Sequence, residues 1–554
     1  MLLYRRLRNL RRLREISRIL VRYGFGYALL QLGVDRLIPI SQWRARVLRR
    51  EYALSPAERL RVALGELGPT FIKLGQALSS RYDLLPQSFV HELRKLQDEA
   101  PPVPYRAVAS VVEAEFGASP EEVFASFEVA PVSSASIGQV HGAVTKDGRR
   151  VVVKVQRPGV MSLVETDLAI MADAASFLHV RSRALRRYDL PAFVREFSAI
   201  IRDELRYRIE AHNAQTIRDN LREFEWVQVP QVVWELTTQR VLTLERLSGV
   251  RIDNVDEIRK RGFDLPLLAA RFAQCIVAQV FVNGFFHGDP HQGNVWVTAD
   301  GELALLDFGS VGRLDRTFRR SLIDLVLALR RQDSKAALDD IAVMGMLGQH
   351  QEVTMLRHDL RRLFTRYYFL PRREFPFGDL FVRVVQIMSN RGVPVSWEFS
   401  LIAKALAITE GICHELDPAF DFDEAAQPVI ERLRRERFSP HALAEEVVEF
   451  ARDIGRDLAA LPDGLNQVLS QLRRGTLRLR VSDEEVDHVL AHHNALYNRI
   501  SLALILSALE VATALFLVSP VASTTVKLWV GIPVAAIAGI AIVLLLGGVA
   551  HPRD

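Results

Sequence analysis

Two short segments contain the residue types that phosphoryl transfer from a nucleotide requires. Residues 287–294 read His-Gly-Asp-Pro-His-Gln-Gly-Asn, which places Asp289 five positions before Asn294. Residues 305–309 read Leu-Leu-Asp-Phe-Gly and centre on Asp307. In kinase-type sites a loop Asp orients the acceptor, an Asn five positions later binds Mg²⁺, and a further Asp before Phe-Gly binds Mg²⁺ at the phosphates. The order of loop, apolar strand and Asp-Phe-Gly predicts Asp289 as the catalytic group and Asn294 and Asp307 as metal ligands, rather than an ordinary polar turn.

A single lysine, Lys154, lies inside the β-branched segment 151–155. A charge in such a strand is unfavourable unless it meets a partner. In a kinase-type site the partners are the α- and β-phosphate oxygens and a helix glutamate, for which Glu210 is the candidate. Two simpler interpretations remain: Lys154 could lie on a solvated edge strand, and Glu210 could be an exposed helix residue.

The segment before Lys154 is expected to lie against the phosphates, although it has one glycine and lacks the G-x-G-x-x-G pattern. Small side chains still let a backbone approach phosphates, and the shortage of glycine makes the loop stiffer. The nucleotide-binding candidates are Val132, Ser133, Ser134, Ala135, Ser136, Ile137, Gly138, Gln139, Val140 and Lys154. We therefore expect ATP and Mg²⁺ as the cofactors of the site.

The elements that must position these residues follow from hydrophobic periodicity. Short β-branched runs predict strands, and the first two flank a turn at 146–148. Longer stretches with helical period separate the strands. The expected strands are 140–145, 151–155, 229–234, 241–245, 295–297 and 303–306, and the expected helical regions are 56–127, 162–222 and most of the chain from 265. A small β-rich lobe followed by a larger helical lobe predicts an α+β, bilobal protein-kinase-like fold.

Composition restricts the remaining possibilities. The 554 residues exceed one ordinary domain, and 49% of them are apolar, which provides for folded cores. The two cysteines, Cys275 and Cys413, have no cysteine partners at metal-ligand spacing, which argues against a disulfide framework or a zinc cluster and favours a reducing compartment. We expect a basic amphipathic segment at 1–50, a helical extension at 51–127, an N-lobe at 128–248, a C-lobe at 249–440, a juxtamembrane helical region at 441–499 and a transmembrane hairpin at 500–550.

The N-terminal segment is strongly basic. Residues 1–22 carry eight arginines against one acid, Glu15, and leucines and isoleucines recur every three or four positions. A basic amphipathic helix of this kind suits an anionic membrane surface. The simpler alternative, a solvated helix packed on its own domain, has equal support. Nucleic acid is not expected as a partner, because the arginines lack interleaved aromatic residues.

The C-terminal end predicts membrane insertion. Ile500–Val521 is a 22-residue apolar run with one charge, Glu510, and Leu528–Ala550 is a 23-residue run with none. Each is long enough to cross the hydrocarbon layer as a helix, and the linker 522–527 permits only a tight hairpin. Arginines flank both ends, so both flanks are expected on the cytoplasmic side. This predicts location in the inner (cytoplasmic) membrane, with the kinase-like body in the cytoplasm.

Together these segments make the chain similar to the UbiB family of atypical kinase-like proteins, bacterial relatives of the mitochondrial coenzyme Q accessory kinases. Four features match the family: the alanine- and serine-rich loop before Lys154, the K-x-G-Q motif at 73–76, the H-x-D-P-H-x-G-N loop at 287–294 and Asp-Phe-Gly at 307–309. The similarity runs from about residue 55 to 420, and the C-terminal helix pair also resembles bacterial members.

The resemblance implies a cleft in which the K-x-G-Q helix folds over the place of a peptide substrate. It implies regulatory roles for Lys73, Gln76 and Glu204, and a catalytic set of Asp289, Lys154 and Glu210. It also implies a function in ubiquinone biosynthesis or isoprenoid-lipid handling rather than ordinary protein phosphorylation. The partners would be ATP, membrane lipids or isoprenoid and quinone precursors, and quinone-biosynthesis proteins.

Two positions depart from the family pattern. The family has E-x-D before the helix glutamate, and this chain keeps Glu204 but has Arg206 in place of the aspartate. We expect this change to weaken one inhibitory contact. Gln292 stands where the family usually has proline, which should loosen the turn slightly. No Ala-Pro-Glu follows Asp307, so the segment that docks peptide substrates in protein kinases is missing.

Three functional interpretations are consistent with these residues. The leading one is a membrane-anchored, kinase-fold protein that binds and hydrolyses ATP. The first alternative is a phosphotransferase for a small molecule or lipid, and the second is a nucleotide-sensing membrane scaffold without turnover. In each case Lys73, an ammonium in an apolar helical stretch, is expected to pair with Asp289 or Asp307 across the mouth of the cleft.

Overall fold

The computed structural model describes residues 2–26, 54–79, 81, 85–96, 100–181, 189–331, 333–347, 353–368, 377–393 and 395–437. Contacts within the chain divide it into two units, Met1–Ser439 and Pro440–Asp554. Every described residue lies in the first unit. The predicted juxtamembrane region and transmembrane hairpin, at 441–499 and 500–550, lie outside the described residues.

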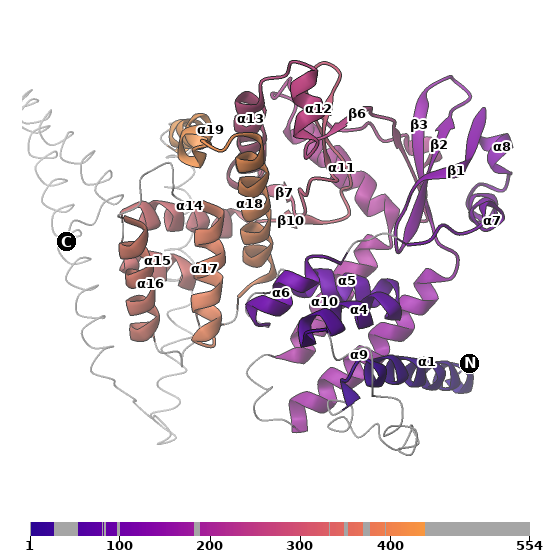
Figure 1. Cartoon of the computed structure of the whole chain (residues 1–554), viewed down its shortest axis with the longest axis horizontal. Coiled ribbons are helices and arrows are strands. Elements are labelled where there is room, and N and C mark those ends of the chain that lie inside the picture. Colours follow the sequence, from indigo (N-terminus) through magenta and orange to yellow (C-terminus); the bar gives the residue numbers. More distant parts are fainter. Residues whose placement is uncertain are drawn as a thin grey trace, which may run out of the picture. The chain divides into compact units, whose positions relative to one another are not determined.

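A four-stranded antiparallel sheet forms the first lobe (Figure 1). Its strands, in spatial order, are β1 (Ser126–Ser134), β2 (Gly138–Val144), β3 (Arg150–Gln156) and β5 (Val241–Glu245). Helices α7 (Tyr105–Phe116) and α8 (Pro120–Val123) cover one face. Alternate β3 residues, Val151, Val153 and Val155, are buried toward that core. The two-residue period of a strand therefore turns Lys154 to the opposite face.

Helices inserted between β3 and β5, together with the N-terminal helices, form a second group (Figure 1). They are α1 (Leu2–Arg22), α4 (Pro56–Leu67), α5 (Pro69–Ser79), α6 (Gln87–Leu93), α9 (Val160–Arg181) and α10 (Leu190–Glu204). The next helix, α11 (Tyr207–Asn220), buries its apolar side chains in the core of the second lobe. Helix α5 carries the K-x-G-Q motif and packs on α4, α6, α9 and α10. Gly75 lets the helices approach closely there: a Cβ atom would lie 2.2 Å from Leu96 Cδ1, so the Leu96 side chain would have to shift.

The second lobe is mainly helical. A mixed sheet runs in the order β4 (Val227–Gln228), β9 (Leu303–Leu305), β8 (Val295–Thr298) and β6 (Gly249–Arg251), and β10 (Val311–Arg313) pairs with β7 (Phe285–His287). The helical segments of this lobe are α12 (Val255–Lys260), α13 (Leu265–Val277), η6 (Ala278–Asn283), α14 (Arg316–Arg331), α15 (Ser334–Val343), α16 (Val353–Tyr368), α17 (Phe377–Asn390), α18 (Trp397–Leu416) and α19 (Phe422–Arg437). The short η5 (Trp234–Leu236) contacts β5 of the first lobe instead.

Helix α18 is held in the centre of this lobe. It packs on α13 and α17, and Cys413 Sγ lies 3.3 Å from the carbonyl oxygen of Ala269 in α13. The Glu410 carboxylate accepts hydrogen bonds from the Phe377 and Gly378 N–H groups, at 2.7 and 3.0 Å, and so caps the N-terminus of α17. These contacts fix the register of α18, which contributes a side chain to the candidate active site.

Two expectations about the secondary structure were wrong in detail, and three short strands were not predicted. Residues 229–234 do not form a regular strand: only Val232 bridges to Leu244, because Pro230 lacks an N–H group for a ladder. The expected loop at 132–140 consists of two strand ends joined by a turn at 135–137. The three-residue strands β6, β7 and β10 are too short to produce a periodic signal.

Helix α1 packs on its own lobe. Ile16 and Ile19 are buried against α4 and α5, and Arg12 forms an ion pair with the fully buried Asp167 of α9. Packing is the simpler of the two interpretations of this basic helix, and the exposed side chains on its other face include Arg14. Among the described residues, one helical stretch, Leu265–Asn283, is long and apolar enough to cross a membrane. It is mostly buried, as a core helix would be.

Candidate active site

Lys154 and Glu210 form a largely buried ion pair. The Lys154 Nζ atom lies 2.8 and 2.9 Å from the two carboxylate oxygens of Glu210, and Glu210 is 2% exposed. Strand β3 is an inner strand, flanked by β2 and β5, so the edge-strand interpretation of Lys154 is wrong. The exposed-helix interpretation of Glu210 is wrong as well. Strand β3 and helix α11 thus bring together the two residues that the sequence predicted as partners.

The Asp307 carboxylate also interacts with the Lys154 ammonium group. Lys154 Nζ lies 3.8 Å from Asp307 Oδ2. Burial acts to lower the pKa of Lys154, but the carboxylates of Asp307 and Glu210 outweigh it and raise that pKa well above its ordinary value. Burial raises the pKa of Glu210 to about 7, against the opposing effect of Lys154. The lysine is therefore a permanent cation between two carboxylates.

Asp307 has an unusual backbone conformation. Its φ is 57°, in the left-handed region that non-glycine residues rarely adopt, and the Gly309 N–H donates to its Oδ1 at 3.1 Å. Burial acts to raise its pKa, but Lys154 and Lys73 outweigh that effect and lower the pKa well below its ordinary value. A strained, permanently ionised carboxylate of this kind is typical of a functional site.

The β8–β9 hairpin brings Asn294 and Asp307 to the same end of the sheet. Asn294 directly precedes β8 and Asp307 follows β9, and the first β8 residue, Val295, pairs with Leu305. The Leu306 N–H donates to the Asn294 carbonyl at 2.8 Å. The Asn294 side-chain Nδ2 donates to the Asp289 carbonyl at 3.2 Å, which leaves its Oδ1 as the amide's remaining ligand atom.

His287 connects the catalytic loop, which we define as residues 287–294, to the segment around Asp307. Its ring is fully buried. Nδ1 accepts the Asp289 N–H at 3.1 Å, so the proton of the neutral ring lies on Nε2, which donates to the Leu306 carbonyl at 3.0 Å. Burial lowers the pKa of His287. The sequence did not predict this positioning function, although His287 begins the motif.

Lys404 is a second residue that the sequence did not predict. It lies on α18, and its Nζ is 2.9 Å from Asp289 Oδ1. Burial would raise the pKa of Asp289, but Lys404 outweighs it and keeps that pKa below its ordinary value. The available signal was a lysine within the largely apolar segment 397–416, which is the same signal that identified Lys154.

The turn before Lys154 is held by Arg157. The Ala135 N–H donates to the Gly138 carbonyl at 2.8 Å, and Arg157 Nε donates to the Ala135 carbonyl at 2.8 Å. Arg157 Nη2 also donates to Ser134 Oγ at 2.9 Å. Gly138 is required, because a Cβ atom there would lie 2.0 Å from Tyr207 Oη. These contacts make a fixed turn of small residues.

The nine residues predicted for this loop differ in their environments. Ile137 is buried in an apolar cluster with α9 and α10. Gln139 is 1% exposed, and its Oε1 accepts the Val103 N–H at 2.8 Å. Val132 is 52% exposed at the end of β1. The side chains of Ile137 and Gln139 are thus used for packing, and the small residues Ala135 and Ser136 of the turn are the better candidates for phosphate contact.

The K-x-G-Q helix contacts the site through Lys73. Lys73 Nζ forms an ion pair with Glu204 at the end of α10, not with Asp289 as one expectation had it. Asp289 has Lys404 as its cation, whereas Asp307 is affected by the charge of Lys73. The expectation for Asp289 failed because α18, which supplies the alternative lysine, is remote in sequence.

Gln76 and Arg206, the two other residues of the family motifs near the site, form contacts with neighbouring segments. Gln76 Nε2 donates to the Leu96 carbonyl at 3.3 Å and so connects α5 to the segment after α6. Arg206, the N-cap residue of α11, turns back toward the end of α10, where it pairs with Asp203 and donates to the Arg202 carbonyl. Among the described residues, the hydrogen bonds and ion pairs of this side chain, which replaces the family aspartate, include neither Lys73 nor Gln76.

The donor set fits a magnesium–nucleotide complex. Mg²⁺ is usually bound by one or two protein oxygens together with phosphate oxygens and water, and Asn294 and Asp307 offer an amide and a carboxylate at one end of a hairpin. No group of three or more His, Cys, Asp or Glu side chains suited to a metal occurs in the part of the chain that the structure describes. Tyr207 Oη, beside Gly138, is buried without a hydrogen-bond partner among the described residues.

Comparison with known proteins identifies related chains. Residues 95–341 match the model of the ABC1 atypical kinase-like domain, and residues 360–421 match the UbiB helical domain. Two Synechocystis proteins named as uncharacterized are similar: sll1770 is 32% identical over 461 residues, covering 82% of this chain and 79% of that protein, and sll0095 is 31% identical over 431 residues, covering 76% of each. A solved structure of Mycobacterium tuberculosis Rv3197 with erythromycin has 28% identity and a TM-score of 0.45, covering 65% of this chain and 92% of that chain.

Proposed function

The chain belongs to the ABC1/UbiB family of atypical kinase-like proteins, and we propose that it binds Mg-ATP at the site around Lys154, Asp289 and Asp307 and hydrolyses it. The observation that carries this proposal is the convergence of Lys154, Glu210 and Asp307 within ion-pair distance. These residues come from three separate elements, β3, α11 and the segment after β9. No structural requirement of the fold alone explains a buried cation between two carboxylates.

Each residue has a distinct task in this proposal. Bound Mg²⁺ would neutralise phosphate charge. Asn294 and Asp307 would hold the metal through oxygen atoms. Lys154, held in place by Glu210, would bind the α- and β-phosphates. Asp289, with its pKa kept low by Lys404, would orient the attacking water or hydroxyl group.

A conventional protein kinase activity is not part of the proposal. Only residues 308–315 separate Asp307 from α14, and β10, within this stretch, pairs with β7. This segment is too short to form the peptide-docking platform between Asp-Phe-Gly and Ala-Pro-Glu in protein kinases. Lys73 and Glu204 further connect α5 to α10 next to the site.

The cellular function is proposed from family membership. We propose that the protein supports ubiquinone biosynthesis or isoprenoid-lipid handling, and that residues 500–550 anchor it in the cytoplasmic membrane. Quinone and lipid profiles of a deletion strain, complemented with wild type or Asp307→Asn, would test the first part. Unchanged profiles in the deletion strain would contradict it.

The membrane anchor at 500–550 is tested separately, by labelling a cysteine introduced at Ser523 with an impermeant reagent in intact cells. Failure to label this cysteine would contradict the proposed anchor.

Purified protein with Mg-ATP distinguishes the biochemical alternatives. Release of free phosphate supports hydrolysis, which is the expected result. A phosphorylated small molecule or lipid would instead make the chain a phosphotransferase that uses the same residues. Binding without turnover would make it a nucleotide-sensing scaffold. Absence of any nucleotide binding would contradict the proposed function altogether.

A further inference from the structure

Helix α18 contacts the catalytic loop near the first residue of the loop and again near its last residue. At the start of the loop, a Cβ atom on Gly288 would lie 2.8 Å from Leu401 Cδ2, so a larger residue here would require the Leu401 side chain to shift. Near the end of the loop, Gln292 Nε2 donates to Glu415 Oε2 at 2.7 Å. Gln292 was expected only to loosen the turn. Its side chain in fact adds a contact between the catalytic loop and α18.

Lys404 lies between these two contacts along α18 and reaches the centre of the loop. Its Nζ is 2.9 Å from Asp289 Oδ1, and the Lys404 and Asp289 side chains are 17% and 30% exposed. The loop itself contains no lysine or arginine between His287 and Asn294. The cation beside Asp289 is thus supplied by the helical region at 360–421, more than a hundred positions later in the chain.

The charges around the site indicate a role for the ammonium group of Lys404. A terminal phosphate close to Asp289 would place negative charge beside a carboxylate, and like charges repel strongly when partly buried. Transfer of a phosphoryl group spreads charge over its equatorial oxygens, which cations stabilise. Lys154 lies with Glu210 and Asp307, and Lys73 lies with Glu204. Lys404 is the cation next to Asp289, on the acceptor side.

We propose that Lys404 binds the terminal phosphate of ATP, so that α18 supplies the residue by which the site distinguishes ATP from ADP. This inference rests on the proposed function. In the absence of nucleotide, Asp289 holds the ammonium group in place. When ATP binds, the same ammonium lies between the Asp289 carboxylate and the terminal phosphate and offsets the repulsion between them.

Calorimetric titration of the full-length protein with Mg-ADP and with a non-hydrolysable Mg-ATP analogue tests the inference without relying on turnover. Lys404→Met should weaken binding of the ATP analogue about 10- to 100-fold, as expected for loss of a charged hydrogen bond, and leave ADP affinity unchanged. Lys404→Arg should restore most of the preference. Lys335→Met, which removes an exposed lysine from α15, should change neither affinity.

The possible outcomes separate the two proposals. Equal weakening for ADP and the ATP analogue in Lys404→Met would mean a structural function only and would overturn the inference. A preserved ATP preference would overturn it as well and leave the proposed function intact. If wild-type protein binds neither nucleotide, the proposed function fails and the inference with it. Should Lys404→Met not fold, Lys404→Met combined with Asp289→Asn removes both charges, and a retained ATP preference there would equally overturn the inference.

Discussion

Lys154 on β3 contacts both carboxylate oxygens of Glu210 on α11, at 2.8 and 2.9 Å, although 56 positions separate them in the chain. The pair is buried, and burying an ion pair stabilises a fold little or not at all relative to apolar side chains. Its presence is therefore better explained by chemistry than by folding. The adjacent Asp307 carboxylate completes a charged group suited to phosphate and metal.

The ion pair between α1 and α9 predicts that the basic N-terminal helix is structurally essential. Arg12 donates to both Asp167 carboxylate oxygens, at 2.7 and 3.1 Å, and Asp167 is fully buried. Arg12→Ala should lower the free energy of unfolding by about 3 kcal/mol, because it leaves a buried carboxylate without its cation. Arg14→Ala, at an exposed position of the same helix, is the control. Equal stability of the two variants in urea denaturation would contradict the packing of α1.

His287 predicts a loss of stability at mildly acidic pH. Its pKa is lower in the folded protein than the ordinary value of 6.5, so the unfolded chain binds more protons below that pH. The free energy of unfolding should therefore decrease as pH falls below about 6.5, where protonation of Nδ1 removes the acceptor for the Asp289 N–H. His287→Gln should show a smaller decrease between pH 7 and 5 in thermal denaturation.

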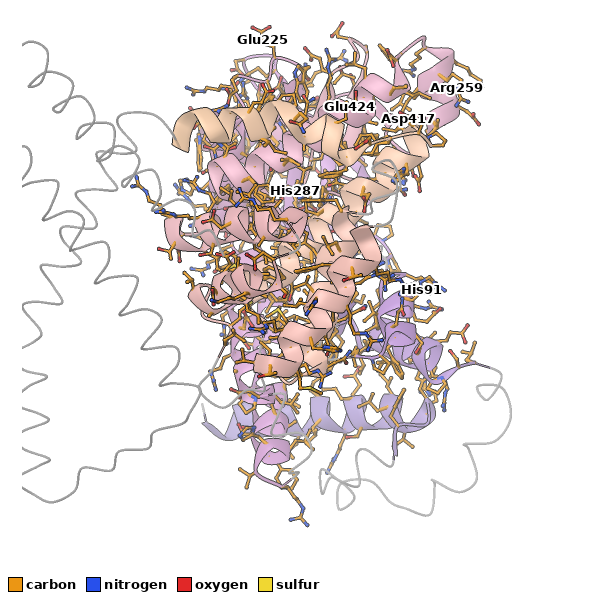
Figure 2. All side chains as sticks on the ribbon, turned by 90° about the vertical axis from the view of Figure 1, so that its left-hand side faces the viewer. His91, Glu225, Arg259, His287, Asp417 and Glu424 are labelled. Atoms are coloured by element: carbon orange, nitrogen blue, oxygen red, sulfur yellow. The ribbon has the colours of Figure 1, made fainter. Side chains whose placement is uncertain are left out.

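The control for this pH dependence is His91→Gln, because His91 is exposed on α6 (Figure 2). This variant should keep the wild-type slope of stability against pH. If His287→Gln and His91→Gln have the same slope as wild type, the buried neutral imidazole is not the group that titrates.

The candidate site was only partly predictable from the sequence. The motif residues Asp289, Asn294 and Asp307 were identifiable because kinase chemistry demands fixed types at short spacing. Their supporting residue Lys404 was not, because its partner lies far away in the chain and an isolated lysine on a helix has no motif. The partner of Lys73 was misassigned in part for the same reason.

The fold itself was predictable at the level of lobes and less so at the level of elements. Strands β2, β3 and β5 have β-branched runs, and the structure places them within two residues of expectation. The segment 229–234 has the same composition but contains Pro230, whose lack of an N–H group prevents regular pairing. Strands such as β7 and β10 exist only because each pairs with the other.

The contact between α5 and α10 predicts a restraint on turnover. Lys73→Ala removes the cation that pairs with Glu204, and we expect basal phosphate release to rise and autophosphorylation to become detectable. Lys335→Ala should have no such effect, since Lys335 is exposed on α15. Restoring the family residue with Arg206→Asp should lower basal phosphate release. Unchanged autophosphorylation in Lys73→Ala would contradict a restraining function for α5.

The central claim is that Asp307 and its neighbours bind Mg-ATP, and calorimetric titration of wild type and Asp307→Asn with Mg-ATP tests it most directly. We predict binding by wild type and about 100-fold or greater weakening in Asp307→Asn, since a metal-held phosphate contact contributes several kcal/mol. Asp300→Asn, an exposed change in the β8–β9 turn, should bind like wild type. Equal Mg-ATP affinity of wild type and a folded Asp307→Asn variant would contradict the assignment of this site.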